Sequence, residues 1–277
     1  MTWHLSGSVE EFADAAGEFL RSRPVEHTVP LTLVDSLRRD GPHVFGSGDP
    51  LFGWYRTTDG PVAGACLQTP PFPLLITAAP DLAALARLLA DRPLPGVNAL
   101  AGDVDEFVAA WRQLTGATVV PGRRSRLFRL DALTPPSPPA PGAPRVAGPA
   151  DHELLIMWMN GFYRDVGEGV RDVAGFVDEK LRYGGLTLWE VDGVPVSMAG
   201  ASRPQSGMVR VQAVYTPPEH RRRGYAGAVT TVVSQAALDA GAVDVVLFTD
   251  LANPTSNALY QRLGYRPVED RTVVEFR

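Results

Sequence analysis

The proline-rich segment at residues 134–145, TPPSPPAPGAPR, constrains the fold of this chain more than any other stretch. Proline has no backbone N–H and fixes the angle φ, so a run this dense fits neither a helix interior nor a central strand. Such a composition is typical of a stiff, extended linker. It divides the 277 residues into two halves of similar size, each long enough for one domain.

The overall composition limits the classes of function. With 45% hydrophobic and 21% charged residues, the chain resembles an ordinary soluble globular protein. A net charge of -5 argues against a dedicated nucleic-acid-binding protein. The single cysteine, Cys66, excludes an internal disulfide and fits a reducing compartment. Neither a signal-peptide pattern nor a long apolar run is found. We therefore expect a cytoplasmic protein, a monomer or homodimer, that binds neither nucleic acid nor membrane.

The two halves carry similar patterns. In the first half, WYRTTDGPVAGACL is typical of two strands joined at Asp59-Gly60, and in the second, LTLWEVDGVPVSMAGAS repeats this around Asp192-Gly193. Each half then ends with a helix pattern, a glycine that stops it, and strand material. The repetition predicts two copies of one α/β unit.

The second half allows a finer prediction of its elements. We expect helices at 151–162 and 173–183, followed by strands at Leu186–Val191, Val194–Ala201 and 208–216. An apolar stripe from Val229 onward predicts an amphipathic helix, and VDVVLFT predicts a buried strand. In NPTSNALYQRLGY, Asn253 is suited to cap a helix, Pro254 to begin it and Gly264 to end it.

The loop YTPPEHRRRGYAGAV lies between a predicted strand and the amphipathic helix. The first N–H groups of a helix lack internal partners and carry the positive end of its dipole, which favours a phosphate. Gly224 and Gly227 permit close approach to the backbone, and the arginines from Arg221 to Arg223 add attraction for an anion. Without this context, three neighbouring arginines would indicate only a solvated surface.

The spacing of this loop excludes two common phosphate sites and favours a third. It contains neither the P-loop pattern nor the glycine spacing of a dinucleotide-binding fold. The pattern Arg221-x-x-Gly224-x-Ala226, with the helix NPTSNALYQRLGY one strand later, resembles the GNAT superfamily of acyl-CoA-dependent N-acyltransferases. The resemblance covers residues from about 146 to 277, and the first half resembles a degenerate copy, as in tandem GNAT proteins.

This resemblance implies a fold and a set of site residues. The fold class is α/β (α+β), with two tandem units, each a mixed, splayed sheet flanked by helices. In the family, the backbone of the fourth strand contacts the pantetheine arm and thioester, N–H groups of the loop hold the pyrophosphate, and a residue at the Asn253 position contacts the cofactor from the other side. The implied cofactor-binding set is Val214, Tyr215, Thr216, Arg221, Arg222, Arg223, Gly224, Tyr225, Ala226, Gly227 and Asn253.

The resemblance also implies a reaction. An amine attacks the thioester of acetyl-CoA without a metal ion, and Tyr260, by its position, would donate a proton to the leaving thiolate. Alternatives stay open: Asn253 is fully explained as a helix cap, and Tyr260 by core packing. Asp165 and Glu168, in the loop after the first helix, either line a pocket for a cationic acceptor or belong to a solvated loop.

The first half differs at the positions that matter for this reaction. No arginine-glycine loop follows its strand LLITAAP, and Trp111 stands where the repeat places Tyr260. We therefore predict a degenerate domain at 1–133 that binds no CoA, a linker at 134–145 and a catalytic acetyltransferase domain at 146–277. The alternative for the whole chain is a non-catalytic acyl-CoA sensor.

Overall fold

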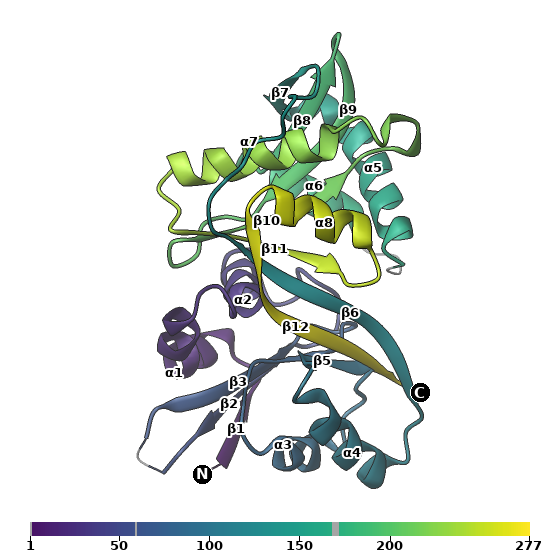
Figure 1. Ribbon diagram of the computed structural model, residues 1–277. Coiled ribbons are helices and arrows are strands. Elements are labelled where there is room, and N and C mark those ends of the chain that lie inside the picture. Colours follow the sequence, from purple (N-terminus) through teal and green to yellow (C-terminus); the bar gives the residue numbers. More distant parts are fainter. Residues whose placement is uncertain (1, 59, 168–171) are drawn as a thin grey trace. The chain divides into compact units, whose positions relative to one another are not determined.

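The structure of the chain is a computed structural model that describes residues 2–58, 60–167 and 172–277. The predicted turn residue Asp59 and loop residue Glu168 lie outside these ranges. The described chain forms two compact units. Unit 1 comprises residues 1–127 and 268–277, and unit 2 comprises residues 128–267. Each is described by itself below, with the element labels of Figure 1.

Unit 1 contains a mixed sheet with the strand order β1-β2-β3-β4-β5-β12. All neighbouring strands are antiparallel except β4 and β5, which are parallel. The strands are β1 (Thr2–Ser6), β2 (Leu51–Arg56), β3 (Val62–Gln68), β4 (Leu74–Ile76), β5 (Gly96–Leu100) and residues 268–276 of β12 (Tyr265–Phe276).

Unit 2 repeats this arrangement. Its strand order is β7-β8-β9-β10-β11, with β6 beside β11, and β10 and β11 are the parallel pair. The pairs β7–β8, β8–β9 and β9–β10 are antiparallel. The strands are the end of β6 (Val119–Leu130), β7 (Ala143–Val146), β8 (Leu186–Val191), β9 (Val194–Ala201), β10 (Met208–Tyr215) and β11 (Asp244–Asp250). The common order confirms the predicted repeat of one splayed α/β unit.

Helices cover both faces of the sheet in each unit (Figure 1). In unit 1, α1 (Val9–Ser22) and α2 (Thr28–Asp40) lie on one face, and α3 (Leu82–Leu89) and α4 (Val104–Thr115) on the other. In unit 2, α5 (His152–Asp165) and α6 (Val173–Leu181) lie opposite α7 (Tyr225–Asp239) and α8 (Pro254–Arg262). Short 3₁₀ helices occupy Pro149–Asp151 and Pro218–His220.

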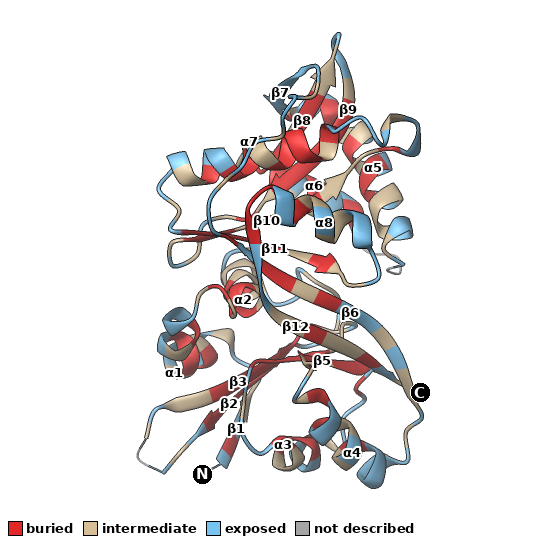
Figure 2. Cartoon of the chain, viewed as in Figure 1, coloured by how far each residue is buried: buried red, intermediate tan, exposed pale blue. Residues whose placement is uncertain are grey.

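The alternation of side chains along the strands explains why each unit has two cores (Figure 2). Successive strand residues point to opposite faces of a sheet. In β2, Phe52 packs with α1 and α2, whereas Leu51 and Tyr55 pack with α3 and α4. In β8, Leu188 and Trp189 divide in the same way between the two helix pairs. A sheet buried on both faces needs this continuous apolar content.

Most elements predicted for the second half are confirmed. β8 and β9 match residue for residue, β10 ends at Tyr215, one residue earlier than predicted, and α6 ends at Leu181. Local chemistry accounts for the accuracy, because Asp192 and Gly193 have φ values of 52° and 78°, as a tight hairpin turn requires. α8 begins after the cap Asn253, and Gly264 follows its end with φ 99°.

The proline-rich segment is part of unit 2 and packs on its core. Its end, from Ala143, is the edge strand β7. Upstream, Ala140 belongs to the partly buried residues around the core that contains α7, and Pro136 lies against Gly227 of that helix. The core of unit 2 also includes Phe128 and Leu130 from β6, which precede the segment in the sequence.

Candidate active site

The parallel strands β10 and β11 separate at their carboxyl ends. They are paired from Met208↔Asp244 to Val211↔Leu247, and the pairing does not continue to Tyr215 and Asp250. The register of β10 with β9 shifts at the same point, where Ala213 has φ 51°. Such a bulge turns backbone groups out of the ladder and is favoured next to active sites. The predicted splay is therefore present in unit 2.

The end of β10 is held by a buried hydroxyl. Ser197, fully buried on β9, donates through Oγ to the Tyr215 carbonyl at 3.0 Å and shares a hydrogen bond of 2.8 Å with Thr216 Oγ1. The Tyr215 ring packs near Trp158 and has its hydroxyl close to Gly161, where a larger residue would clash. Burial, followed by the nearby Asp165 carboxylate, raises the pKa of Tyr215 above its ordinary value. Ser197 and Gly161 were not singled out from the sequence, because each makes contact only across the fold.

The amino end of α7 presents backbone donors beside this opening. Gly224 is the N-cap with φ 84° and has no side chain to cap the helix, and Arg222 also has a positive φ of 63°. The first hydrogen bond inside the helix runs from Ala228 N to Gly224 O at 3.1 Å. Within the described part of the chain, the N–H groups of Tyr225, Ala226 and Gly227 have no acceptor. They form the positive end of the helix dipole, which attracts anions.

Side chains from other parts of unit 2 also lie close to Gly224 and Gly227. A Cβ atom on Gly227 would lie 3.3 Å from Leu259 Cδ1 and 3.3 Å from Pro136 Cγ. A Cβ atom on Gly224 would lie 3.5 Å from the Ala140 Cβ. The sequence explained both glycines by close approach of a ligand. The structure adds a second reason for each: at Gly227 it is the packing of α7 against α8 and the proline-rich segment, and at Gly224 it is the positive φ of 84°.

The three arginines of the loop are not equivalent. Arg221 donates through Nε to the Thr216 carbonyl at 2.9 Å and through Nη2 to Asp165 Oδ2 at 2.5 Å. Its guanidinium also lies 5.9 Å from the centre of the Tyr215 ring. Arg222 and Arg223 are exposed and, among the described residues, have no acidic partner. These two arginines are the ones free to meet an anion at the start of α7.

The start of α8 is fixed by two asparagines. Asn253 accepts from Ser256 N at 3.0 Å through its side chain, as a helix cap does. Asn257 donates through Nδ2 to the carbonyls of Asp250 and Asn253, at 2.8 and 2.7 Å, and so ties α8 to the end of β11. Its Oδ1 is buried and has no hydrogen-bond partner among the residues that the structure describes. Asn257 has no signal in the sequence, because an asparagine inside a helix has no distinctive pattern.

Tyr260 lies in the core beside α7. Its side chain is 7% exposed and packs edge-on against Tyr265, with 6.1 Å between the ring centres. Burial raises the pKa of the Tyr260 hydroxyl far above its ordinary value, so the proton stays on the oxygen at neutral pH. The neighbouring Tyr265 hydroxyl is engaged with Ser234 Oγ at 2.7 Å. The core contacts fit the interpretation of Tyr260 as a packing residue. The retained proton is what the interpretation as an acid requires.

The remaining predicted residues are placed as follows. Asp165, at the end of α5, contacts Arg221, so its carboxylate already has a cationic partner. In unit 1, Trp111 is buried in α4 and stacks on Phe107 and Phe276. Cys66 is buried, and burial raises the pKa of its thiol. In the described ranges, no group of three or more possible metal ligands occurs and no helix is long and apolar enough to cross a membrane.

Comparison with known proteins identifies a family whose sequence model matches this region. The sequence model of the acetyltransferase (GNAT) family matches residues 155–265, which include the separating strands, the arginine-glycine loop and α8, and end at the first residue of β12. A comparison with curated proteins found no match.

Solved structures match the chain over almost its full length. A Drosophila protein has a TM-score of 0.71 at 13% identity and covers 99% of this chain and 98% of its own. A GNAT-family acetyltransferase from Colwellia psychrerythraea has a TM-score of 0.61 at 12% identity, covering 100% and 99%. A tandem GNAT protein from the clavulanic acid biosynthesis pathway has a TM-score of 0.57 at 15% identity, covering 100% and 98%. Residues 155–265 therefore belong to the GNAT family of acetyltransferases, and the chain as a whole has the fold of a tandem GNAT protein.

Proposed function

We propose that this chain is an acetyl-CoA-dependent N-acetyltransferase and that unit 2 carries out the transfer to a primary amine. The observation that supports it most is the separation of β10 from β11 after Val211 and Leu247, directly beside the uncapped start of α7. The separated strand ends offer backbone groups to an extended arm, and the helix start offers donors to a pyrophosphate.

The residues present suit acetyl-CoA. The free N–H groups of Tyr225, Ala226 and Gly227 and the exposed side chains of Arg222 and Arg223 are donors that a pyrophosphate accepts. The backbone of Val214, Tyr215 and Thr216 follows the bulge of β10 and would pair with the pantetheine arm. Asn253, at the start of α8, would contact the arm from the side of β11.

Acetyl-CoA supplies an acetyl group activated as a thioester, which an amine can attack directly. Backbone N–H groups near Val214 would stabilise the negative charge that develops on the carbonyl oxygen, and one such donor is typically worth about 3 kcal/mol. Tyr260 would donate a proton to the departing sulfur.

One observation favours the alternative of a non-catalytic acyl-CoA sensor. Tyr260 belongs to the apolar core and packs against Tyr265, which is the environment of a structural tyrosine. A sensor would use the loop at α7 for binding and would need no acid at position 260. The two functions share the binding site and differ only in turnover.

Two measurements test the proposal. Calorimetric titration with acetyl-CoA should show one site per chain, because only unit 2 carries the arginine-glycine loop. Thiol release from acetyl-CoA is then followed with a panel of small amines, peptides with free amino ends and amino sugars. Binding with turnover on any amine supports the enzyme, binding without turnover on the whole panel favours the sensor, and absence of binding contradicts both.

A further inference from the structure

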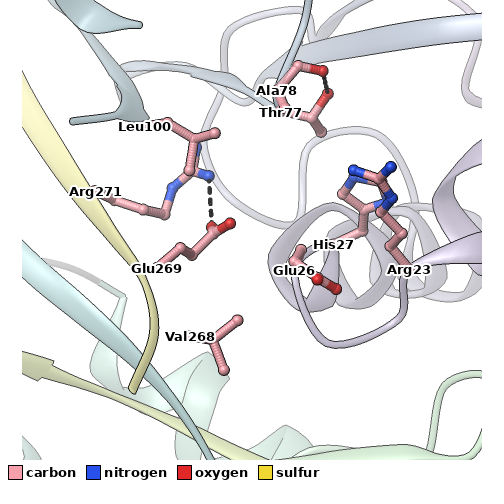
Figure 3. A pocket seen from close by; sticks show the side chains of 9 residues that line it. All are labelled: Arg23, Glu26, His27, Thr77, Ala78, Leu100, Val268, Glu269 and Arg271. Carbon is pink, nitrogen blue, oxygen red and sulfur yellow. Dashed lines mark hydrogen bonds and ion pairs between the residues drawn. The ribbon is translucent and has the colours of Figure 1, made fainter. Parts of the chain in front are cut away.

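Unit 1 contains a polar cavity that the acetyl-transfer proposal does not use. Its volume is about 180 Å³, and it lies at the ends of β4 and β5, the strands that correspond to β10 and β11 of unit 2 (Figure 3). Arg271 and Glu269 of β12 line one side, and Arg23, Glu26 and His27, from the connection between α1 and α2, line the other. All of these residues belong to unit 1.

The arginine in this cavity is already used by the protein. Arg271 is 5% exposed and donates through Nε to Asn98 Oδ1 at 3.1 Å and through Nη1 to Glu269 at 3.2 Å. Its Nη2 donates to the carbonyls of Ile76 and Asn98, at 2.5 and 3.1 Å, and so bridges β4 and β5. A guanidinium with this many partners is a structural cation, and it does not offer its donors to a ligand.

The histidine in the cavity offers a free acceptor. His27 is 3% exposed, and its Nδ1 lies 3.1 Å from the Leu20 carbonyl, which can only accept, so this nitrogen carries a proton. Among the described residues, Nε2 has no hydrogen-bond partner. Burial lowers the pKa of His27, which favours the neutral ring with a lone pair on Nε2.

The acids add further acceptors. Arg271 occupies one side of the Glu269 carboxylate, and the side chain of Glu26 has no ion-pair partner in the described part of the chain. Arg23, by contrast, is exposed. The formal charges of these two acids and of Arg23 and Arg271 cancel, so net charge does not select a ligand. Selection comes from the polar atoms that His27, Glu26 and Glu269 present at the cavity wall, and these are acceptors.

An acceptor that is held away from bulk water is stabilised by a hydrogen-bond donor. Because His27, Glu26 and Glu269 all present hydrogen-bond acceptors to the cavity of unit 1, we infer that it binds the ammonium group of a small primary amine. A cavity of about 150 Å³ admits benzene, so the space in unit 1 suits a compound of similar or slightly larger size. This inference concerns binding in unit 1, and it holds whether or not unit 2 transfers an acetyl group.

The test uses three probes of matched length in the absence of acetyl-CoA: pentylammonium, 1-pentanol and pentanoate. Binding to the full chain is followed by NMR titration of the histidine ring signals and by calorimetry. We expect pentylammonium to bind at one site at least about tenfold tighter than either control and to shift the His27 Nε2 resonance. Tighter binding of pentanoate, equal binding of all three, or no saturable binding of pentylammonium would overturn the inference.

Three charge-matched variants locate the site. Glu269→Gln and Glu26→Gln each remove one acidic acceptor, and Glu269→Gln keeps an amide oxygen for Arg271. Each should weaken the binding of pentylammonium by about tenfold, because each removes a hydrogen bond between two charged groups. Glu275→Gln removes the same charge from an exposed position of β12 and should change the affinity less than about twofold. Equal effects of Glu269→Gln and Glu275→Gln would contradict the site, and Glu26→Gln decides the matter if Glu269→Gln does not fold.

Discussion

The guanidinium of Arg221 forms an ion pair with the carboxylate of Asp165, with 2.5 Å between Nη2 and Oδ2. The two residues come from the loop before α7 and the end of α5, and both side chains are 44% exposed. An exposed pair of this kind contributes little to stability. Its consequence for the site is different: it holds Arg221 over the Tyr215 ring and leaves the start of α7 to Arg222 and Arg223.

We therefore predict unequal effects of alanine substitutions on acetyl-CoA binding. Arg222→Ala and Arg223→Ala should each raise the Kd by about tenfold, because each removes a charged donor to phosphate. Arg221→Ala should raise it less than about threefold. Calorimetry gives the three values, and Arg266→Ala, which removes an exposed arginine elsewhere in unit 2, controls for the change in net charge. A largest effect from Arg221→Ala would contradict the assignment.

The role of Tyr260 is tested with a matched pair of tyrosines. Tyr260→Phe should lower kcat by about a hundredfold or more, the usual contribution of a positioned acid, and should leave the KM for acetyl-CoA within about twofold. Tyr265→Phe removes the neighbouring hydroxyl, which is bonded to Ser234. It should reduce stability by about 1 kcal/mol and leave kcat unchanged.

Steady-state kinetics and urea denaturation of both variants separate the two effects. If Tyr260→Phe keeps the wild-type kcat, Tyr260 is a core residue, and another group protonates the leaving thiolate.

The parts of this structure that follow from the sequence are those set by near neighbours. Asn253, Pro254 and Gly264 mark the ends of α8 because capping, ring geometry and positive φ act within one helical turn. Asp192 and Gly193 mark a hairpin for the same reason. The arginine-glycine loop was found because its glycines and the helix that follows are contiguous.

Contacts between distant residues could not be predicted. Arg221 and Asp165 are 56 residues apart, and Arg271 and Ile76 are 195 apart. No local pattern places the end of the chain beside β5, yet Val274 pairs with Val97 there. His27 carried no signal at all, because a single histidine between two helices is recognised as a cavity residue only when β4 and β12 are in place.

The two glycines that end α4 and α8 permit a paired stability test. Both have positive φ, 70° at Gly116 and 99° at Gly264. A Cβ atom on Gly116 would meet nothing within 4 Å, whereas one on Gly264 would clash with the Ala132 carbonyl oxygen. Gly116→Ala should therefore cost only the left-handed backbone penalty, about 1–2 kcal/mol.

Gly264→Ala adds a clash with backbone and should cost more than Gly116→Ala by at least about 2 kcal/mol, within the range of strongly destabilising substitutions. Urea denaturation of the two variants measures the difference. Equal losses would show that the chain around Ala132 moves aside easily.

Lys180, the only lysine of the chain, permits a test of how pH acts on stability. It is buried beside Tyr183, whose hydroxyl accepts from Nζ at 2.5 Å, and burial lowers its pKa to about 8 from an ordinary value of 10.5. Between these two values the unfolded chain holds a proton that the folded chain releases, so this group makes the free energy of unfolding rise with pH. The contribution from pH 7.5 to 9.5 is about 2 kcal/mol.

Cys66 acts in the opposite direction over part of this range. Burial raises the pKa of its thiol, so the unfolded chain loses a proton that the folded chain keeps, and stability falls as pH rises. The test therefore compares two variants, Cys66→Ala alone and Cys66→Ala with Lys180→Met. The free energy of unfolding of each is measured by urea denaturation at pH 7.5 and 9.5. Lys180→Met should remove the increase of about 2 kcal/mol, and an increase that persists in this variant would show that another group releases the proton.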